Sequence, residues 1–346
     1  MEAKVRQRIL ILLILSIALA VLGQYYFANK RTFMWDGISL YLVAMVLFVL
    51  VIALLEPGLR RAEGTGFPNL WQEFWQALHQ SPIRLAMLGL SVILIAYVTT
   101  TSRVRPSPKP FWDLLILWAV SIILALAAFA NWAGILQRLR RVWAGLSRPT
   151  PEFILVLALA IASLLLRIIN LNGIPFVLSG DEASMGLEIN EVLEGRQTNP
   201  FITTWFTNPT LYFFMQAASM RLFGVNAAAL RIPSALTAVP TVILLYLFVK
   251  RYYGRWTAIL AALLFASYHY AIHFGRIGIN NIWDPFFALG AIYFFARGLE
   301  SRRLGYLLVS AAFTGFSVYF HAGSRLTQII MILYLAHWAW RERTLL

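Results

Sequence analysis

The sequence EFILVLALAIASLLLRIINLNGIPFVLSGDEASMGLEI (residues 152–189) passes from a long apolar run into a polar stretch with two adjacent carboxylates. Residues 152–170 supply about the 20 predominantly apolar residues that a helix needs to cross a bilayer. The chain has only 15 acidic residues among 346, yet Asp181 and Glu182 lie a few residues beyond this predicted membrane exit. We therefore expect a membrane-spanning helix that leads into a polar segment at the membrane surface.

The composition places this helix in a larger membrane domain. The chain is 60% hydrophobic and 13% charged, and its mean hydropathy is +0.70. Soluble domains are less apolar and about twice as charged, so we predict an all-α polytopic membrane protein. No small-residue cleavage site follows the first apolar run, so we expect that run to be retained. About ten transmembrane helices are predicted, at residues 9–27, 37–55, 83–100, 111–131, 152–170, 232–249, 255–273, 283–298, 304–320 and 326–341.

The net charge of +14 comes from basic residues scattered through short loops between the apolar runs. This distribution is typical of orientation signals and does not indicate nucleic-acid binding. Most basic loops fall on one side when the N-terminus is cytoplasmic, so we expect that orientation. As a separate expectation, the multi-pass protein is placed in a bacterial plasma membrane. The absence of cysteine excludes disulfides and thiolate metal sites.

Two apolar segments are predicted to lie at the membrane surface. Residues 210–223 are too few to span a bilayer, so residues 171–231 form one external loop in this interpretation. Residues 67–80 place apolar side chains on one helical face, which predicts an interfacial helix on the inner side. A basic, proline-marked stretch near residue 150 separates two predicted domains, a four-span region at 1–150 and a membrane core at 151–346.

The carboxylate pair has a simple interpretation and a functional one. Ser179 and Gly180 precede it, so the segment can turn into a helix that Asp181 caps. Alternatively, one carboxylate is a general base for a hydroxyl nucleophile, because ionisable groups near the bilayer tend to mark functional sites. Glu188, Glu191 and Glu194 follow at spacings typical of a solvated helix face.

Three other predicted junctions share the membrane side of this pair. They contain the candidate residues Arg231, His269, His273, Arg276, Asn281, Asp284, His321 and Arg325. Arginine side chains suit a phosphate group, although Arg231 and Arg325 could also snorkel from helix ends. Asp284 precedes a proline and could be a helix cap. His269 and His273 are four residues apart, as in some metal sites, but a third ligand is not evident.

Residues 152–341 resemble the glycosyltransferase family 39 and aminoarabinose-transferase group, which includes protein O-mannosyltransferases. Three segments carry the resemblance in order: LLLRIINLNGIPFVLSGDEASMGLEI (164–189), TNPTLYFFMQAASMRLFGVNAAALRIPSAL (207–236) and YGRWTAILAALLFASYHYAIHFGRIGINNIWDPFF (253–287). The resemblance implies a type-C glycosyltransferase-like core with external juxtamembrane helices. It also implies inverting transfer of a sugar from a polyprenyl-phosphate donor to a hydroxyl acceptor at the outer membrane face.

The resemblance assigns the catalytic base to Asp181, with Glu182 beside it. We expect Arg231, Arg276, Asn281, Asp284, His321 and Arg325 to contact substrate or phosphate. Two positions depart from the family pattern: Asn281 stands where many members have a second aspartate, and Thr207 and Asn208 replace a Glu-Lys pair before Pro209. No cofactor is therefore required by the sequence, and a divalent metal ion stays open as an alternative, with His269 and His273 as candidate ligands.

Six core spans follow residue 150, fewer than in the family, so we expect a core that is incomplete at its C-terminus. This expectation supports an alternative function, a non-catalytic membrane subunit of a larger complex. The predicted partners are a polyprenyl-phosphate sugar, an acceptor of unknown class, membrane lipids and, in the alternative, another membrane protein.

Overall fold

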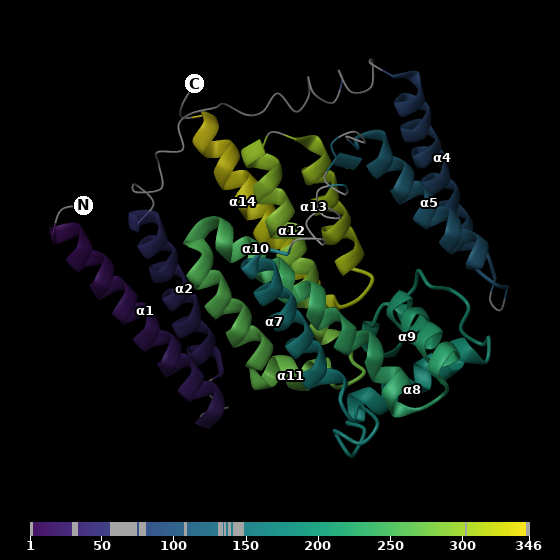
Figure 1. Ribbon diagram of the computed structural model, residues 1–346, viewed down its shortest axis with the longest axis horizontal. Coiled ribbons are helices and arrows are strands. Elements are labelled where there is room, and N and C mark those ends of the chain that lie inside the picture. The colour runs from purple at the N-terminus through teal and green to yellow at the C-terminus, as the bar shows by residue number, and fades with distance from the viewer. Residues whose placement is uncertain are drawn as a thin grey trace. The chain divides into compact units, whose positions relative to one another are not determined.

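Figure 1 shows the computed structural model, which describes residues 3–29, 34–55, 81–106, 109–130, 149–301 and 303–343, and single positions 75, 134, 136, 137 and 140. Within these ranges every regular element is a helix, and Thr203 and Pro209 form an isolated β-bridge. The predicted all-α class is confirmed.

The chain divides into two compact units, Met1–Gly66 and Phe67–Leu346. In the first unit, α1 (Ala3–Asn29) packs on α2 (Met34–Leu55), and the Ser16 hydroxyl donates to the Ala44 carbonyl at 2.8 Å. These units do not coincide with the domains predicted from the sequence, whose boundary at residue 150 stays a prediction. The predicted interfacial helix at 67–80 lies outside the described residues, except for Trp75.

The second unit contains the remaining described helices. In chain order they are α4 (Pro82–Val104), α5 (Trp112–Ala128), α7 (Pro151–Ile168), α8 (Gly180–Leu193), η3 (Trp205–Thr207), α9 (Thr210–Phe223), α10 (Ala227–Ser267), α11 (His269–Gly275), η4 (Asn280–Ile282), α12 (Trp283–Ser301), α13 (Leu304–Ser317), η5 (Ala322–Ser324) and α14 (Arg325–Arg343). A described helix accompanies each of the ten predicted spans, although α10 is continuous through two of them. Continuous apolar runs favour helices because their backbone groups are satisfied within the segment.

Helix α10 folds back on itself at Gly254, where φ is +84°. Its first arm begins near the end of α7, because Arg231 donates to the Leu171 carbonyl at 3.0 Å. Its second arm ends there too, since Arg167 of α7 donates to the Ala266 carbonyl at 3.2 Å. The turn lies at the opposite end of α7, where Lys250 pairs with Glu152. The two spans predicted at 232–249 and 255–273 are therefore two antiparallel arms, and a glycine supplies the left-handed turn between them.

Four described helices are long and apolar enough to cross a membrane: Gln7–Tyr26, Pro82–Val104, Pro151–Ile168 and Ala227–Ser267. Four shorter apolar helices accompany them, at Trp35–Phe48, Trp112–Ala128, Leu304–Ser317 and Arg325–Ala336. These apolar helices, with many large side chains exposed toward the surroundings, confirm a polytopic membrane protein. The count of ten spans stays a prediction.

Helices α8 and α9 form a separate layer, which Figure 1 shows beyond the ends of α7 and α10. One apolar core joins this layer to α4, α5 and α12. It contains Val98 of α4, Trp118 of α5, Ile189 of α8, Phe213 of α9 and Phe287 of α12. Helix α9 begins and ends as predicted, but most of its side chains are buried in this core. Because it is covered by protein, α9 is a packed core helix and not an exposed interfacial one.

Candidate functional site

The acidic pair lies in the first turn of α8. Ser179 is the N-cap, and its hydroxyl oxygen accepts a hydrogen bond from the backbone N–H of Glu182 at 3.2 Å. The interpretation of Asp181 as the cap is therefore wrong: the cap lies two residues earlier, with the serine in the extended conformation that caps require. Both carboxylates still lie at the positive end of the helix, where negative charge is stabilised.

Helical geometry separates the two carboxylates. Consecutive helical residues point about 100° apart, and here Glu182 is fully buried while Asp181 is exposed. Glu182 continues the buried stripe of Met185, Ile189 and Val192, at offsets of three, seven and ten residues. The apolar spacing of α8 was therefore a sequence signal for the burial of Glu182, although the adjacent pair drew attention away from it.

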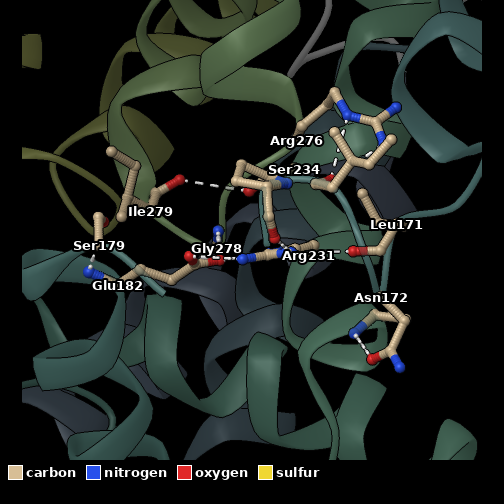
Figure 2. A network of polar contacts seen from close by, with 12 residues as sticks. Leu171, Asn172, Ser179, Glu182, Arg231, Ser234, Arg276, Gly278 and Ile279 are labelled. Carbon is tan, nitrogen blue, oxygen red and sulfur yellow. Dashed lines mark hydrogen bonds and ion pairs between the residues drawn. The ribbon is translucent and has the colours of Figure 1, made fainter. Parts of the chain in front are cut away.

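Buried Glu182 is an anchor between three segments (Figure 2). Arg231 of α10 holds it in a two-pronged ion pair, with Nε–Oε1 at 2.7 Å and Nη2–Oε2 at 2.9 Å. The backbone N–H of Gly278 donates to Oε1 at 2.7 Å. Arg231 is 1% exposed and also donates to the carbonyls of Leu171 and Pro175, both at 3.0 Å. The snorkelling alternative for Arg231 is wrong, because its charge is compensated inside the protein.

Arg276 fixes the end of α7 (Figure 2). Its guanidinium donates to the carbonyls of Leu166 at 2.8 Å, Ile169 at 2.7 Å and Ile174 at 3.0 Å. These carbonyls lie at and just beyond the last turn of α7, where acceptors lack helical partners. Burial and the nearby charge of Arg231 lower the pKa of Arg276 from its ordinary value. The Arg276 side chain therefore binds backbone carbonyls and is buried, so it is not available at the surface.

Asp181 is the carboxylate of the pair that faces outward. Within the described part of the chain, its side chain makes no hydrogen bond or ion pair. Glu188 lies seven residues later on the same face of α8, about 10 Å along the axis. Further along, Glu191 and Glu194 both pair with Arg196, which lowers the pKa of Glu191. Asp181 is thus accessible and attached to a firmly anchored helix start.

A second polar cluster joins the later junctions to the same layer. The buried amide of Asn280 donates to Asn208 Oδ1 at 2.9 Å and to the Phe320 carbonyl at 2.8 Å. Asn208 precedes α9, so this amide connects the loop before α9, the start of α12 and the end of α13. Asn281, the residue singled out from the sequence, is instead exposed. The structural role falls on its neighbour, Asn280.

Asp284, His321 and Ser324 form a compact group beside that amide. Asp284 Oδ2 lies 2.5 Å from His321 Nδ1, and the Ser324 hydroxyl donates to Asp284 Oδ1 at 2.6 Å. The helix-cap interpretation of Asp284 does not describe these contacts, because its carboxylate reaches across to the α13–α14 junction. Since the serine contacts the aspartate and not the imidazole, the group lacks the order of a hydrolytic serine–histidine–aspartate relay. Arg325 follows directly and is exposed.

His269 and His273 are exposed on α11 and were candidates for metal binding. Among the described residues, no cluster of three or more histidine, aspartate or glutamate side chains could hold a metal ion. The described residues therefore do not bring together the three side-chain ligands that a metal centre commonly uses.

A cavity of about 260 Å³ lies toward the far end of α8 from Asp181. It is lined by Arg105 and Phe111 of the α4–α5 connection and by residues of α8 and the following loop: Glu188, Glu191, Arg196, Gln197, Asn199 and Ile202. Its charges are largely paired internally, with Arg105 bound to Asp113 and Arg196 bound to Glu191. Sequence patterns do not predict this contribution from α4 and α5, because it depends on packing between distant segments.

Fold and site together define a multi-pass helical membrane protein whose helix junctions bring an accessible carboxylate, arginines and an Asp–His pair to one end. Residues 207–346, less than half of the chain, match the family model described as dolichyl-phosphate-mannose-protein mannosyltransferase. The match confirms the resemblance to glycosyltransferase family 39 over the region that contains Arg231, Arg276, Asp284, His321 and Arg325. It begins after Asp181 and Glu182.

A curated protein of known sequence is also similar to part of the chain. "Putative mannosyltransferase YkcB" of Bacillus subtilis (strain 168) is 29% identical over 133 residues, which cover 38% of this chain and 18% of that protein. The matched segment thus spans less than a fifth of that relative's length. No solved structure matches the chain significantly.

Proposed function

We propose that this chain carries the core of an inverting glycosyltransferase that uses a polyprenyl-phosphate sugar, with Asp181 as the general base. The observation that carries the proposal is that the two adjacent carboxylates have different environments. Both oxygens of Glu182 are engaged by Arg231 and the Gly278 N–H, whereas Asp181, the preceding residue, is exposed. An anchored helix start that presents one free carboxylate suits a base that must meet a hydroxyl group.

The proposed step transfers one proton and one sugar. Asp181 accepts the proton of the acceptor hydroxyl. At the same time, the oxygen of that hydroxyl forms a bond to the anomeric carbon on the face opposite the phosphate. The bond from that carbon to the phosphate oxygen breaks, and its electron pair leaves with the polyprenyl phosphate. The proton passes from Asp181 to solvent afterwards. Cationic N–H donors near the leaving phosphate stabilise the charge that develops there, and Arg325 is an exposed candidate at this end.

The lipid specificity of the site tests this function directly. Purified chain in lipid nanodiscs is titrated with polyprenyl monophosphate and, as a control, with the uncharged polyprenol of equal length. Native mass spectrometry should detect retention of the phosphate-bearing lipid at concentrations at least tenfold below those needed for the alcohol. Equal retention of both lipids, or retention of neither, contradicts the proposal. The second outcome, together with a stable co-purifying membrane protein, supports the non-catalytic subunit instead.

We also propose that the Asp181 end faces outside the cytoplasmic membrane, with the N-terminus inside. Val225 and Tyr253 are 70% and 68% exposed and flank the first arm of α10, which spans about 40 Å. Because the chain has no cysteine, Val225→Cys and Tyr253→Cys provide single labelling sites. A membrane-impermeant maleimide should label Val225→Cys in intact cells and Tyr253→Cys only after permeabilisation. The reverse pattern would place the site in the cytoplasm.

A further inference from the structure

The α13–α14 junction is built around the imidazole of His321. Both oxygens of Asp284 are already engaged, one by His321 Nδ1 at 2.5 Å and one by the Ser324 hydroxyl at 2.6 Å. Ser324 is 2% exposed, so this second contact is shielded from water. An aspartate whose two oxygens are occupied in this way is poorly placed to take a substrate or a metal ion. Its contacts instead fix the direction of the histidine ring.

The surrounding backbone is shaped to the same pair. A Cβ atom on Gly323 would come within 2.8 Å of His321 Nδ1 and 2.9 Å of Asp284 Oδ2, so the loop approaches the pair as only glycine allows. The residue before His321 is held by Asn280, whose amide donates to the Phe320 carbonyl at 2.8 Å. The Phe320 ring also lies against Trp283, with 4.7 Å between ring centres. Position and orientation of the imidazole are therefore determined from several sides.

This arrangement leaves one ring nitrogen available. A carboxylate only accepts hydrogen bonds when ionised, so the contact with Asp284 assigns a hydrogen to Nδ1. Within the described part of the chain, His321 Nε2 and the Arg325 guanidinium have no hydrogen-bond or ion-pair partner. The His321 side chain is 22% exposed, so its outer edge is within reach of a ligand. In the imidazolium form both ring nitrogens carry a hydrogen, so His321 Nε2 is then a second donor of this junction, four residues before the exposed guanidinium of Arg325.

We propose that His321, as an imidazolium, donates a hydrogen bond from Nε2 to the phosphate of the lipid-linked donor, and that Asp284 is the positioning residue that aims it. The inference rests on the proposed function and specifies which junction holds the phosphate. Nδ1 is held by Asp284, whereas Nε2 is not among the buried polar atoms of the described residues that lack a partner, so it is accessible to an anionic oxygen. A donor aimed in advance at an oxygen that gains charge during bond cleavage favours the leaving phosphate.

Variants of the two residues give distinguishable expectations for the Kd of polyprenyl monophosphate in nanodiscs. His321→Ala should raise this Kd about 10- to 100-fold, the effect of removing a hydrogen bond to a charged group. His321→Gln, whose amide nitrogen can replace Nε2, should retain more affinity than His321→Asn, whose amide nitrogen lies nearer to the Nδ1 position. Asp284→Asn should weaken binding less than His321→Ala. The double variant should bind no more weakly than His321→Ala alone. His273→Ala, which removes an exposed histidine of the preceding junction, is the matched control and should leave Kd unchanged.

A spectroscopic measurement separates a phosphate contact from a purely structural role. The chain has five histidines, so side-chain ¹⁵N resonances of a histidine-labelled sample can be assigned with His321→Gln. Polyprenyl monophosphate should shift the Nε2 resonance of His321, leave Nδ1 protonated and leave His273 unaffected. A melting temperature for each variant shows whether it is folded.

The outcomes separate this inference from the proposed function. If wild-type protein binds the phosphate lipid and folded His321→Ala binds it equally well, the inference is overturned and the proposed function stands. Bound lipid without a shift at Nε2 has the same meaning. If wild-type protein does not bind the phosphate lipid, the proposed function fails and the inference fails with it.

Discussion

Asp181→Asn should reduce sugar transfer about 10²- to 10⁴-fold, the usual contribution of a positioned general base. The amide keeps the size and shape of the carboxylate but cannot accept the acceptor proton. Asp181 is exposed and has no hydrogen-bond partner among the described residues, so the substitution should change stability by no more than about 0.5 kcal/mol. The loss should therefore appear in turnover, with an unchanged melting temperature.

The assay follows release of polyprenyl phosphate from a polyprenyl-phosphate sugar in membranes that contain the chain and its natural acceptors. Glu188→Gln is the matched control, because it removes a carboxylate from the same face of α8 two turns away. The control should stay within about twofold of wild type, since Glu188 is half-buried but makes no hydrogen bond or ion pair among the described residues. Wild-type turnover by folded Asp181→Asn would reject Asp181 as the base.

Glu182→Ala should destabilise the protein by about 3–5 kcal/mol, because it leaves the guanidinium of Arg231 buried without its counter-charge. The Arg231 side chain is 1% exposed, and the Gly278 N–H would also lose its acceptor. The consequence should be a large fall in melting temperature or loss of folded protein from membranes. This outcome contrasts with Asp181→Asn, although the two substitutions affect neighbouring carboxylates.

A double variant shows whether the effect comes from the ion pair. Glu182→Leu with Arg231→Met removes both charges and should be less destabilised than the sum of the single variants by more than about 1 kcal/mol. Additive effects would mean that the two side chains stabilise the protein independently. Unfolding of Glu182→Ala at the wild-type temperature would contradict the buried anchor altogether.

Sequence patterns predicted the helices well because apolar runs and backbone satisfaction dominate in a membrane. The hydropathy minimum around Gly254 separated two helical arms, and residues 210–223 were correctly bounded as a short helix. What the sequence did not supply was the environment of α9. Its apolar residues suit either a membrane surface or a protein core, and the choice depends on packing against distant helices.

The sequence predicted which residues belong to the candidate site better than it predicted what each residue does. Asp181, Glu182, Arg231, Arg276, Asp284 and His321 were all named from residue type and topology. Their contacts could not be, because the ion pair between Glu182 and Arg231 joins positions 49 residues apart. Gly278 and Ser324 escaped notice for the same reason, since nothing local distinguishes a glycine N–H or a serine that completes a distant network. Asn208 was noted only as a departure from the family pattern, and its contact with Asn280 was not predicted.

The most direct measurement is a cryo-electron-microscopy structure of the protein in a lipid nanodisc with polyprenyl monophosphate. The account predicts phosphate density within hydrogen-bond distance of His321 Nε2 or Arg325, on the same end as Asp181, with the Asp181 carboxylate facing the space beyond the phosphate. Density for the phosphate beside the Gly254 turn, or an Asp181 carboxylate sealed against protein with no access to the lipid headgroup, would contradict it.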